Sequence, residues 1–199
     1  KETEYLRDVL QCRNLTIVDV GANTGLVSIP ILMSLPSTAH LIAFEPNPEL
    51  YDRFLDNLEL NNLENFTSHD VALSDAKGEG HIHLPPQTNL ETGRLNVRYD
   101  HGLPQRIPVQ IHKITDYLNT IPRNEFGLLK VDVEGYEDRV LKPLFDLANP
   151  NLPELIYIEV SQKKHWKYSV LKMLKNHGYE LLQDFDNKKL YQLQKDTAQ

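Results

Sequence analysis

Carboxylate side chains recur along this chain at or near the ends of apolar, β-rich runs. Asp19 lies in LTIVDV, Glu45 in HLIAFE, Asp70 in FTSHDVALS, Asp132 and Glu134 in FGLLKVDVE, and Glu159 in ELIYIEV. In an open α/β sheet the ligand crevice lies outside the carboxyl ends of the strands, so we expect these acids to converge on one cleft. Any one of them could simply be a solvated charge, but recurrence over five runs argues against that. Acids that face one another need a cation or hydrogen-bond donors, which predicts a ligand with positive charge and hydroxyls.

The turn VDVGANTG narrows this ligand further. Gly21 and Gly25 follow one apolar run and precede a helical segment, which permits a tight turn with free N–H groups. The pattern is not the G-x-G-x-x-G of dinucleotide-binding folds, and Asp19 would repel a pyrophosphate but suits an ammonium group. Glu45 can accept hydrogen bonds from ribose hydroxyls, and Asp70 from an adenine amino group. An adenosine with a cationic amino-acid tail is S-adenosylmethionine.

Apolar runs alternate with helical patterns, which predicts a parallel sheet covered by helices on both faces. The predicted strands are 15–20, 40–45, 66–74, 126–134 and 154–160, followed by an antiparallel pair joined through Asp186 and Asn187. The predicted helices are an N-terminal one within 1–14, then 26–35, 46–62, 136–147 and 165–178. Residues 75–112 contain glycines and Pro85-Pro86, and we expect a hairpin or extended insertion that contributes to the acceptor site.

The composition is that of one globular domain spanning residues 1–199. Of 199 residues, 40% are hydrophobic and 25% charged, and the formal net charge is −7. Because no basic run is present, nucleic-acid binding is disfavoured. A single cysteine, no apolar stretch long enough to span a membrane and a charged first segment predict a cytoplasmic protein. The chain does not begin with Met, so a removed N-terminal segment stays open.

The motifs VDVGANTG, FEPNPELYDRFLDNLELN, VALSD and LLKVDVEGYE together resemble the FkbM-type methyltransferases, a branch of the class I S-adenosylmethionine-dependent enzymes. The resemblance implies an α/β, Rossmann-like, doubly wound sheet of seven mostly parallel strands, with the last strand antiparallel and helices on both faces. It also implies methyl transfer, usually to a hydroxyl oxygen of a sugar, polyketide or other natural product. One departure is Pro30 inside the predicted first crossover helix, where we expect a lost hydrogen bond and a local kink.

The same resemblance implies roles for individual residues. The methionine part of the cofactor is expected against Asp19, Gly21, Ala22, Asn23, Thr24 and Gly25. The ribose is expected against Glu45 and Pro46, and the adenine against Asp70 and Val71. Asp132 and Glu134 are then expected to face the transferred methyl group.

The chemistry of methyl transfer suggests further candidates. The protein must hold acceptor and methyl group at near-attack distance and remove a proton from a hydroxyl acceptor. In LLKVDVEGYE, Lys130, Asp132 and Glu134 stand at every second position, which predicts one charged face of the strand. Asp132 and Glu134 are the predicted catalytic residues, with Lys130 pairing with one of them. Glu159, Asn89 and Arg94 are the predicted acceptor-binding residues. The last two lie in the polar loop 87–95, which is either a lid or an ordinary surface loop.

Three alternatives stay open at this stage. Asp132, Glu134 and Glu159 could bind Mg²⁺ and orient the acceptor, although no compact ligand motif favours a metal. An NAD-dependent oxidoreductase is opposed by Asp19 and by the missing G-x-G-x-x-G. A non-catalytic nucleoside-binding domain would keep the same residues. The identity of the acceptor, oxygen versus nitrogen as the methylated atom, and the oligomeric state are not determined by the sequence.

Overall fold

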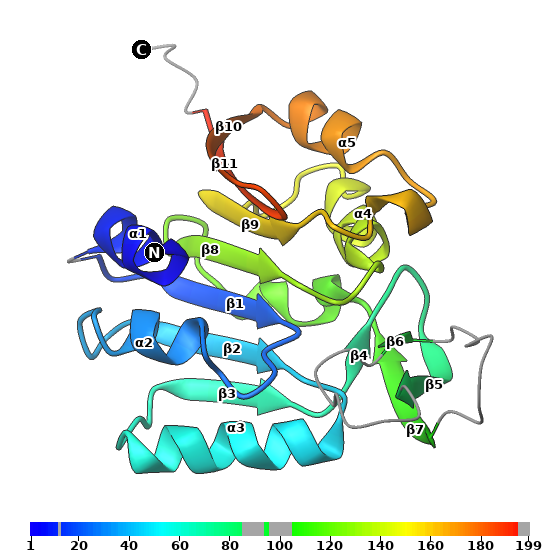
Figure 1. Ribbon diagram of the computed structural model, residues 1–199. Coiled ribbons are helices and arrows are strands. Elements are labelled where there is room, and N and C mark those ends of the chain that lie inside the picture. Colours follow the sequence, from blue (N-terminus) through cyan, green and yellow to red (C-terminus); the bar gives the residue numbers. More distant parts are fainter. Residues whose placement is uncertain (12, 85–93, 96–104, 195–199) are drawn as a thin grey trace.

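The computed structural model describes residues 1–11, 13–84, 94–95 and 105–194, and a seven-stranded sheet forms its centre (Figure 1). The strands are β1 Thr16–Val20, β2 His40–Phe44, β3 Phe66–His69, β8 Phe126–Val131, β9 Leu155–Glu159, β10 Tyr179–Phe185 and β11 Lys188–Leu193. Their order is β10-β11-β9-β8-β1-β2-β3. The last strand, β11, lies antiparallel between β9 and β10, and the pairs from β9 to β3 are parallel. The predicted sheet is therefore confirmed.

Helices cover both faces of this sheet. Helices α1 Glu2–Leu10, α2 Ser28–Leu32 and α3 Pro48–Leu60 pack on one face, with Leu6, Ile31 and Phe54 among the buried side chains. On the other face lie α4 Glu137–Phe145, α5 Val170–Asn176 and the 3-10 turns Ile114–Asp116 and Leu118–Thr120. Alternate residues of β8 enter the two cores, Leu128 the first and Leu129 the second. Lys130 therefore shares the face of α1 to α3.

Helix α3 follows from its sequence. The Asn47 side chain accepts a hydrogen bond from the Glu49 N–H at 3.2 Å, and Pro48 occupies the first turn, where its missing N–H costs nothing. The predicted apolar stripe is buried and consists of Leu50, Phe54 and Leu58. This helix begins directly after Glu45 and Pro46, so its cap fixes the segment that borders the site.

The predicted third strand is wrong as a single element. It divides into β3 in the main sheet and β4 Ala72–Leu73 in a second, four-stranded sheet of order β4-β7-β5-β6. The other strands of that sheet are β5 Gly78–Leu84, β6 Arg94–Leu95 and β7 Gln105–His112, and β5 pairs antiparallel with both β6 and β7. Because the second sheet buries its own apolar cluster, which includes Ile82 and Ile111, the chain leaves the main sheet at Asp70.

Three further expectations are corrected. Strand β8 ends at Val131, and Glu134 has φ of 55° in a turn, so Lys130, Asp132 and Glu134 do not share one strand face. Helix α2 has five residues rather than the predicted ten, and Pro30 stands in its first turn, where a proline is tolerated best. The last helix begins at Val170 rather than near His165. Among the described residues, no helix has the length and apolarity needed to span a membrane.

Candidate active site

A cavity of about 330 Å³ lies at the carboxyl ends of the central strands. Nine of the residues predicted from sequence line it: Gly21, Ala22, Asn23, Glu45, Pro46, Val71, Asp132, Glu134 and Glu159. The second sheet adds Ile82 and Leu95, and β11 adds Lys188. The fold therefore gathers segments that are far apart in the chain around one cavity, as the positions of the acids predicted.

Other predicted site residues do not line this cavity. Asp19 is fully buried behind it, while Thr24, Gly25 and Asp70 are not among its lining residues. Asn89 lies outside the described residues. Arg94 belongs to β6, next to the cavity-lining Leu95, but the position of its side chain is not described.

The glycine turn after β1 is shaped by the protein itself. Gly21 has φ of +79°, and a Cβ there would lie 1.9 Å from the Asp132 carbonyl oxygen. The Asp132 N–H also donates to the Val20 carbonyl at 3.0 Å. Only glycine permits this approach of the β1 turn to the end of β8, so Gly21 sets the position of Asp132.

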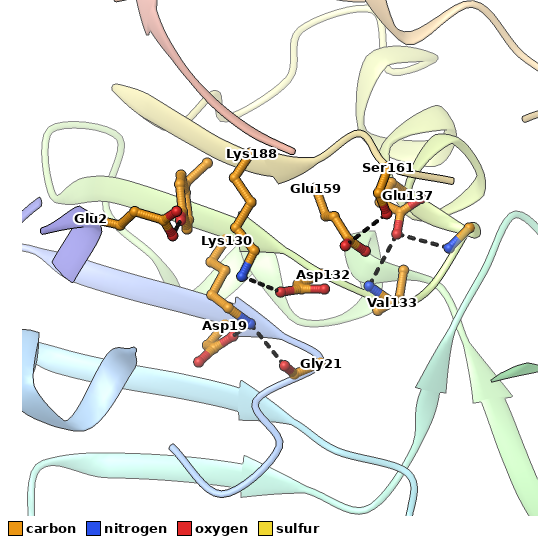
Figure 2. A network of polar contacts seen from close by, with 12 residues as sticks. Glu2, Asp19, Gly21, Lys130, Asp132, Val133, Glu137, Glu159, Ser161 and Lys188 are labelled. Atoms are coloured by element: carbon orange, nitrogen blue, oxygen red, sulfur yellow. Dashed lines mark hydrogen bonds and ion pairs between the residues drawn. The ribbon is translucent and has the colours of Figure 1, made fainter. Parts of the chain in front are cut away.

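A buried ion pair lies beneath the turn. Lys130 Nζ is 2.7 Å from Asp19 Oδ1 and donates to the Gly21 carbonyl at 2.8 Å (Figure 2). Asp19 and Lys130 are directly opposite in the parallel β1–β8 pair, which makes Asp19 the natural partner. The prediction that Lys130 pairs with Asp132 or Glu134 is therefore wrong. Burial works against the charged form of Lys130, but the nearby charges of Asp19 and Asp132 raise its pKa above the ordinary value.

Three of the carboxylates that line the cavity form a group. Asp132, Glu134 and Glu159 each place one oxygen within 4.8 Å of the others. Lys188 Nζ lies 2.9 Å from Asp132 Oδ2, and the Ser161 hydroxyl donates to Glu159 Oε1 at 2.8 Å (Figure 2). Lys188 reaches the group because it is opposite Glu159 in the antiparallel β9–β11 pair.

The environments of these carboxylates separate their pKa values. Burial favours the neutral form of Asp132, but the positive charges of Lys130 and Lys188 outweigh it and lower its pKa. Glu159 is only partly buried, yet burial and the negative charge of Asp132 raise its pKa to about 7. Near neutral pH the group therefore contains an ionised Asp132 beside a Glu159 that can take up or release a proton.

Glu45 connects two loops of the cavity. Its side chain is buried, and its two oxygens accept hydrogen bonds from the Asn23 and Asn47 N–H groups, each at 2.9 Å. Burial raises the pKa of Glu45, and these two hydrogen bonds partly offset the rise. Each carboxylate oxygen has a second lone-pair site, which leaves Glu45 able to accept from a ligand.

Comparison with known proteins decides the family. The model of the methyltransferase FkbM domain matches residues 19–181, which is most of the chain and includes every cavity-lining residue except Lys188. The chain belongs to the FkbM methyltransferase family.

Individual relatives agree with this assignment. Methyltransferase 1 of Beauveria bassiana (strain ARSEF 2860) is 26% identical over 82% of this chain and 71% of that protein. Methyltransferase sdnD of Sordaria araneosa is 27% identical over 92% of this chain and 80% of that protein. Sp1610 of Streptococcus pneumoniae, solved in complex with S-adenosyl-L-methionine, has the same fold with a TM-score of 0.51 and 12% identity, over 99% and 75% of the two chains.

Two important residues of this FkbM methyltransferase escaped sequence reasoning. Lys188 lies in a strand whose register could not be predicted, and no local pattern marks it. Glu137 closes the motif LLKVDVEGYE and then begins α4, where its side chain is fully buried. A buried charge at the end of a recognised motif was the available signal for Glu137.

Proposed function

We propose that this FkbM methyltransferase uses S-adenosylmethionine to methylate a hydroxyl oxygen of a small acceptor. The observation that carries the proposal is the single cavity lined by the glycine turn, Glu45, Val71 and the Asp132–Glu134 segment. The fold shared with Sp1610, which was solved with this cofactor, adds support. The net charge of −7 and the acids at the cavity argue against a nucleic-acid acceptor.

The residues present fit this cofactor. The N–H groups and tight backbone of the Gly21 turn suit the methionine part, and Glu45 can accept from ribose hydroxyls. Asp19 has no exposed surface and already pairs with Lys130, so we assign it to the support of the Gly21 turn and not to direct contact with the cofactor. Phe44, Leu50 and Val71 supply an apolar wall for the adenine. When bound, the cofactor would supply an electrophilic methyl group on a positively charged sulfur.

The three carboxylates at the cavity have different roles in the proposed reaction. Asp132 and Glu134 lie in the segment proposed to face the methyl group, where negative charge favours a sulfonium ligand. Asp132 is held ionised by the charges of Lys130 and Lys188, and its lowered pKa also makes it a weak proton acceptor. The pKa of Glu159 is raised to about 7, so we assign the acceptor's proton to Glu159. Acceptor binding by Glu159, Asn89 and Arg94 remains part of the proposal.

A metal-dependent version fits less well. Asp132, Glu134 and Glu159 are close enough to share a divalent cation, and hard oxygen ligands suit Mg²⁺. Lys188 Nζ, however, already lies on Asp132 and would repel the ion. We therefore propose a reaction that needs no metal, and the expected result is that EDTA leaves turnover unchanged. Loss of turnover with EDTA and recovery with Mg²⁺ would favour the metal.

The decisive experiment is calorimetric. Titration with S-adenosylmethionine should give saturable one-site binding, whereas NAD should give none. Asp132→Asn should weaken this binding, and the exposed Asp52→Asn is the matched control. Binding of NAD alone would refute the proposal. A panel of acceptors in matched hydroxyl and amine forms, followed by mass spectrometry, then tests the methylated atom, and products from amines only would contradict O-methylation.

A further inference from the structure

The carboxylate of Glu137 is surrounded by three N–H donors. One oxygen accepts from the Gly135 N–H at 2.9 Å and the Val133 N–H at 3.2 Å (Figure 2). The other accepts from Trp166 Nε1 at 2.7 Å. The residue has no exposed surface, so it cannot contact a ligand in the cavity directly. Whatever it contributes to the site must act through these three partners.

Two of those partners lie on either side of Glu134. Glu134 and Gly135 have φ of 55° and 104°, and a left-handed conformation at a residue other than glycine costs about 1–2 kcal/mol. Such a conformation persists only where the surroundings hold it. Because the Val133 and Gly135 N–H groups donate to the same oxygen, Glu137 fixes the 132–133 and 134–135 peptide groups, and Glu134 lies between them. The direction of the Glu134 side chain therefore depends on Glu137.

The third partner extends this link to a second segment. Trp166 follows β9 in the segment that also contains Ser161, the hydrogen-bond donor to Glu159. Glu137 thus joins the turn after β8, which carries Asp132 and Glu134, to the segment after β9, which begins directly after Glu159. Movement of either segment would change the spacing of Asp132, Glu134 and Glu159.

We propose that Glu137 is a positioning residue that holds the 132–135 turn and, through Trp166, the segment after β9 in the arrangement that receives the cofactor. The inference rests on the proposed function for the identity of that cofactor. It adds a residue that touches neither cofactor nor acceptor and yet sets the geometry of the acids that do.

Asp138 supplies a matched control. It is also fully buried at the start of α4, and one of its oxygens accepts from the Lys167 and Tyr168 N–H groups at 2.7 and 2.8 Å. No described hydrogen bond of Asp138 reaches the 132–135 turn. Asp138→Asn therefore removes a buried negative charge next to Glu137 while leaving the turn's donors satisfied.

The test variant is Glu137→Gln. An amide has one oxygen, so it can accept from the turn only if its NH₂ group faces the Trp166 N–H, which is also a donor. Leaving a buried donor unsatisfied is expected to weaken S-adenosylmethionine binding by about tenfold or more, measured by calorimetry well below the unfolding temperature. Glu137→Gln with Trp166→Phe removes the opposed donor, so the amide oxygen can accept from the turn again, and the double variant should recover the part of the lost affinity that depends on the turn. Asp138→Asn should bind with wild-type affinity.

Trp166 also provides a direct signal, because the chain contains one tryptophan. Its indole N–H resonance should shift in Glu137→Gln, and the Val133 and Gly135 amides should exchange faster with solvent. Wild-type affinity in Glu137→Gln, an equal loss in Asp138→Asn, or no recovery in the double variant would overturn the inference. If the wild-type protein does not bind S-adenosylmethionine, the proposed function fails. The positioning role is then tested by amide exchange alone, and unchanged exchange of the Val133 and Gly135 amides in Glu137→Gln refutes it. If Glu137→Gln does not fold, Trp166→Phe must show the amide and affinity changes in weaker form.

Discussion

Replacing Lys130 with Met tests the buried ion pair below the cavity. The side chains of Lys130 and Asp19 are 5% and 0% exposed, and their charged atoms are 2.7 Å apart. Met keeps most of the volume of the lysine stem, so packing changes little. The variant nevertheless leaves Asp19 as a buried charge without its cation, and this loss typically costs about 3–5 kcal/mol.

Urea unfolding at pH 7 measures this cost. Thermal unfolding should show the same loss. For a chain of this size, 1 kcal/mol corresponds to about 2–4 °C in the unfolding temperature, so we expect the unfolding temperature to decrease by about 6–20 °C. The double variant Lys130→Met with Asp19→Asn no longer buries an unpaired charge and should be more stable than Lys130→Met alone. The exposed i,i+4 pair of Lys142 and Asp146 is the control, and Lys142→Met should cost less than about 1 kcal/mol.

Two results would refute this reasoning. If Lys130→Met lowers the free energy of unfolding by less than about 1 kcal/mol, Asp19 is not held as a charge by Lys130. If the effects of Lys130→Met and Asp19→Asn simply add, the two side chains are not coupled despite their contact. Either result would also argue against the ion pair as a support of the Gly21 turn, to whose carbonyl Lys130 donates.

Three further predictions concern the rim of the cavity. Gly21→Ala should destabilise the protein by about 2–5 kcal/mol in urea unfolding, because the added Cβ clashes with the Asp132 carbonyl. The control is Gly178→Ala, where φ is also positive at +80° but an added Cβ would meet no atom closer than 3.8 Å, and this variant should cost only about 1–2 kcal/mol. The pKa of Glu159 is raised from 4.5 to about 7, so the folded state holds this proton more tightly and the free energy of unfolding should fall as the pH rises from 4.5 to 7. After allowance for solvent screening, Glu159→Gln should remove about 1 kcal/mol of that fall. An unchanged dependence of the free energy of unfolding on pH in this variant would contradict the raised pKa of Glu159. Lys188→Met should change stability by less than about 1 kcal/mol but raise the pKa of Asp132, and a carboxyl ¹³C titration without an upward shift would exclude Lys188 as its partner.

The main sheet was predictable because its signals are local. Alternating apolar runs and helical patterns require nothing beyond neighbouring residues, and the Asn47-Pro48 start of α3 is visible in the sequence itself. The convergence of Glu45, Asp132 and Glu159 on one cavity also follows from a general property of parallel sheets. These predictions depend on the order of elements and not on how any two side chains pair.

What could not be predicted depends on contacts across the sheet. The run FTSHDVALS reads as one strand, and only the second sheet, with Ile82 and Ile111 in its apolar cluster, explains why the chain changes sheets near Asp70. Likewise, alternation in LLKVDVEGYE predicts a charged face, but the strand ends at Val131 and Glu134 lies in a turn. Spacing in the sequence therefore placed Asp132 and Glu134 at the cavity but gave Lys130 the wrong partner.

The two lysines of the site explain why its acids differ. Lys130 comes from the central strand β8 and neutralises Asp19, while Lys188 comes from β11 and lies on Asp132. With one lysine contact at each of these acids, neither described lysine contact reaches Glu159, whose pKa rises because of burial and because the charge of Asp132 lies beside it. Insertion of the antiparallel last strand next to β9 is what places Lys188 there. The same strand order that closes the sheet thus creates, within one group of carboxylates, an acid held ionised and another able to exchange a proton near neutral pH.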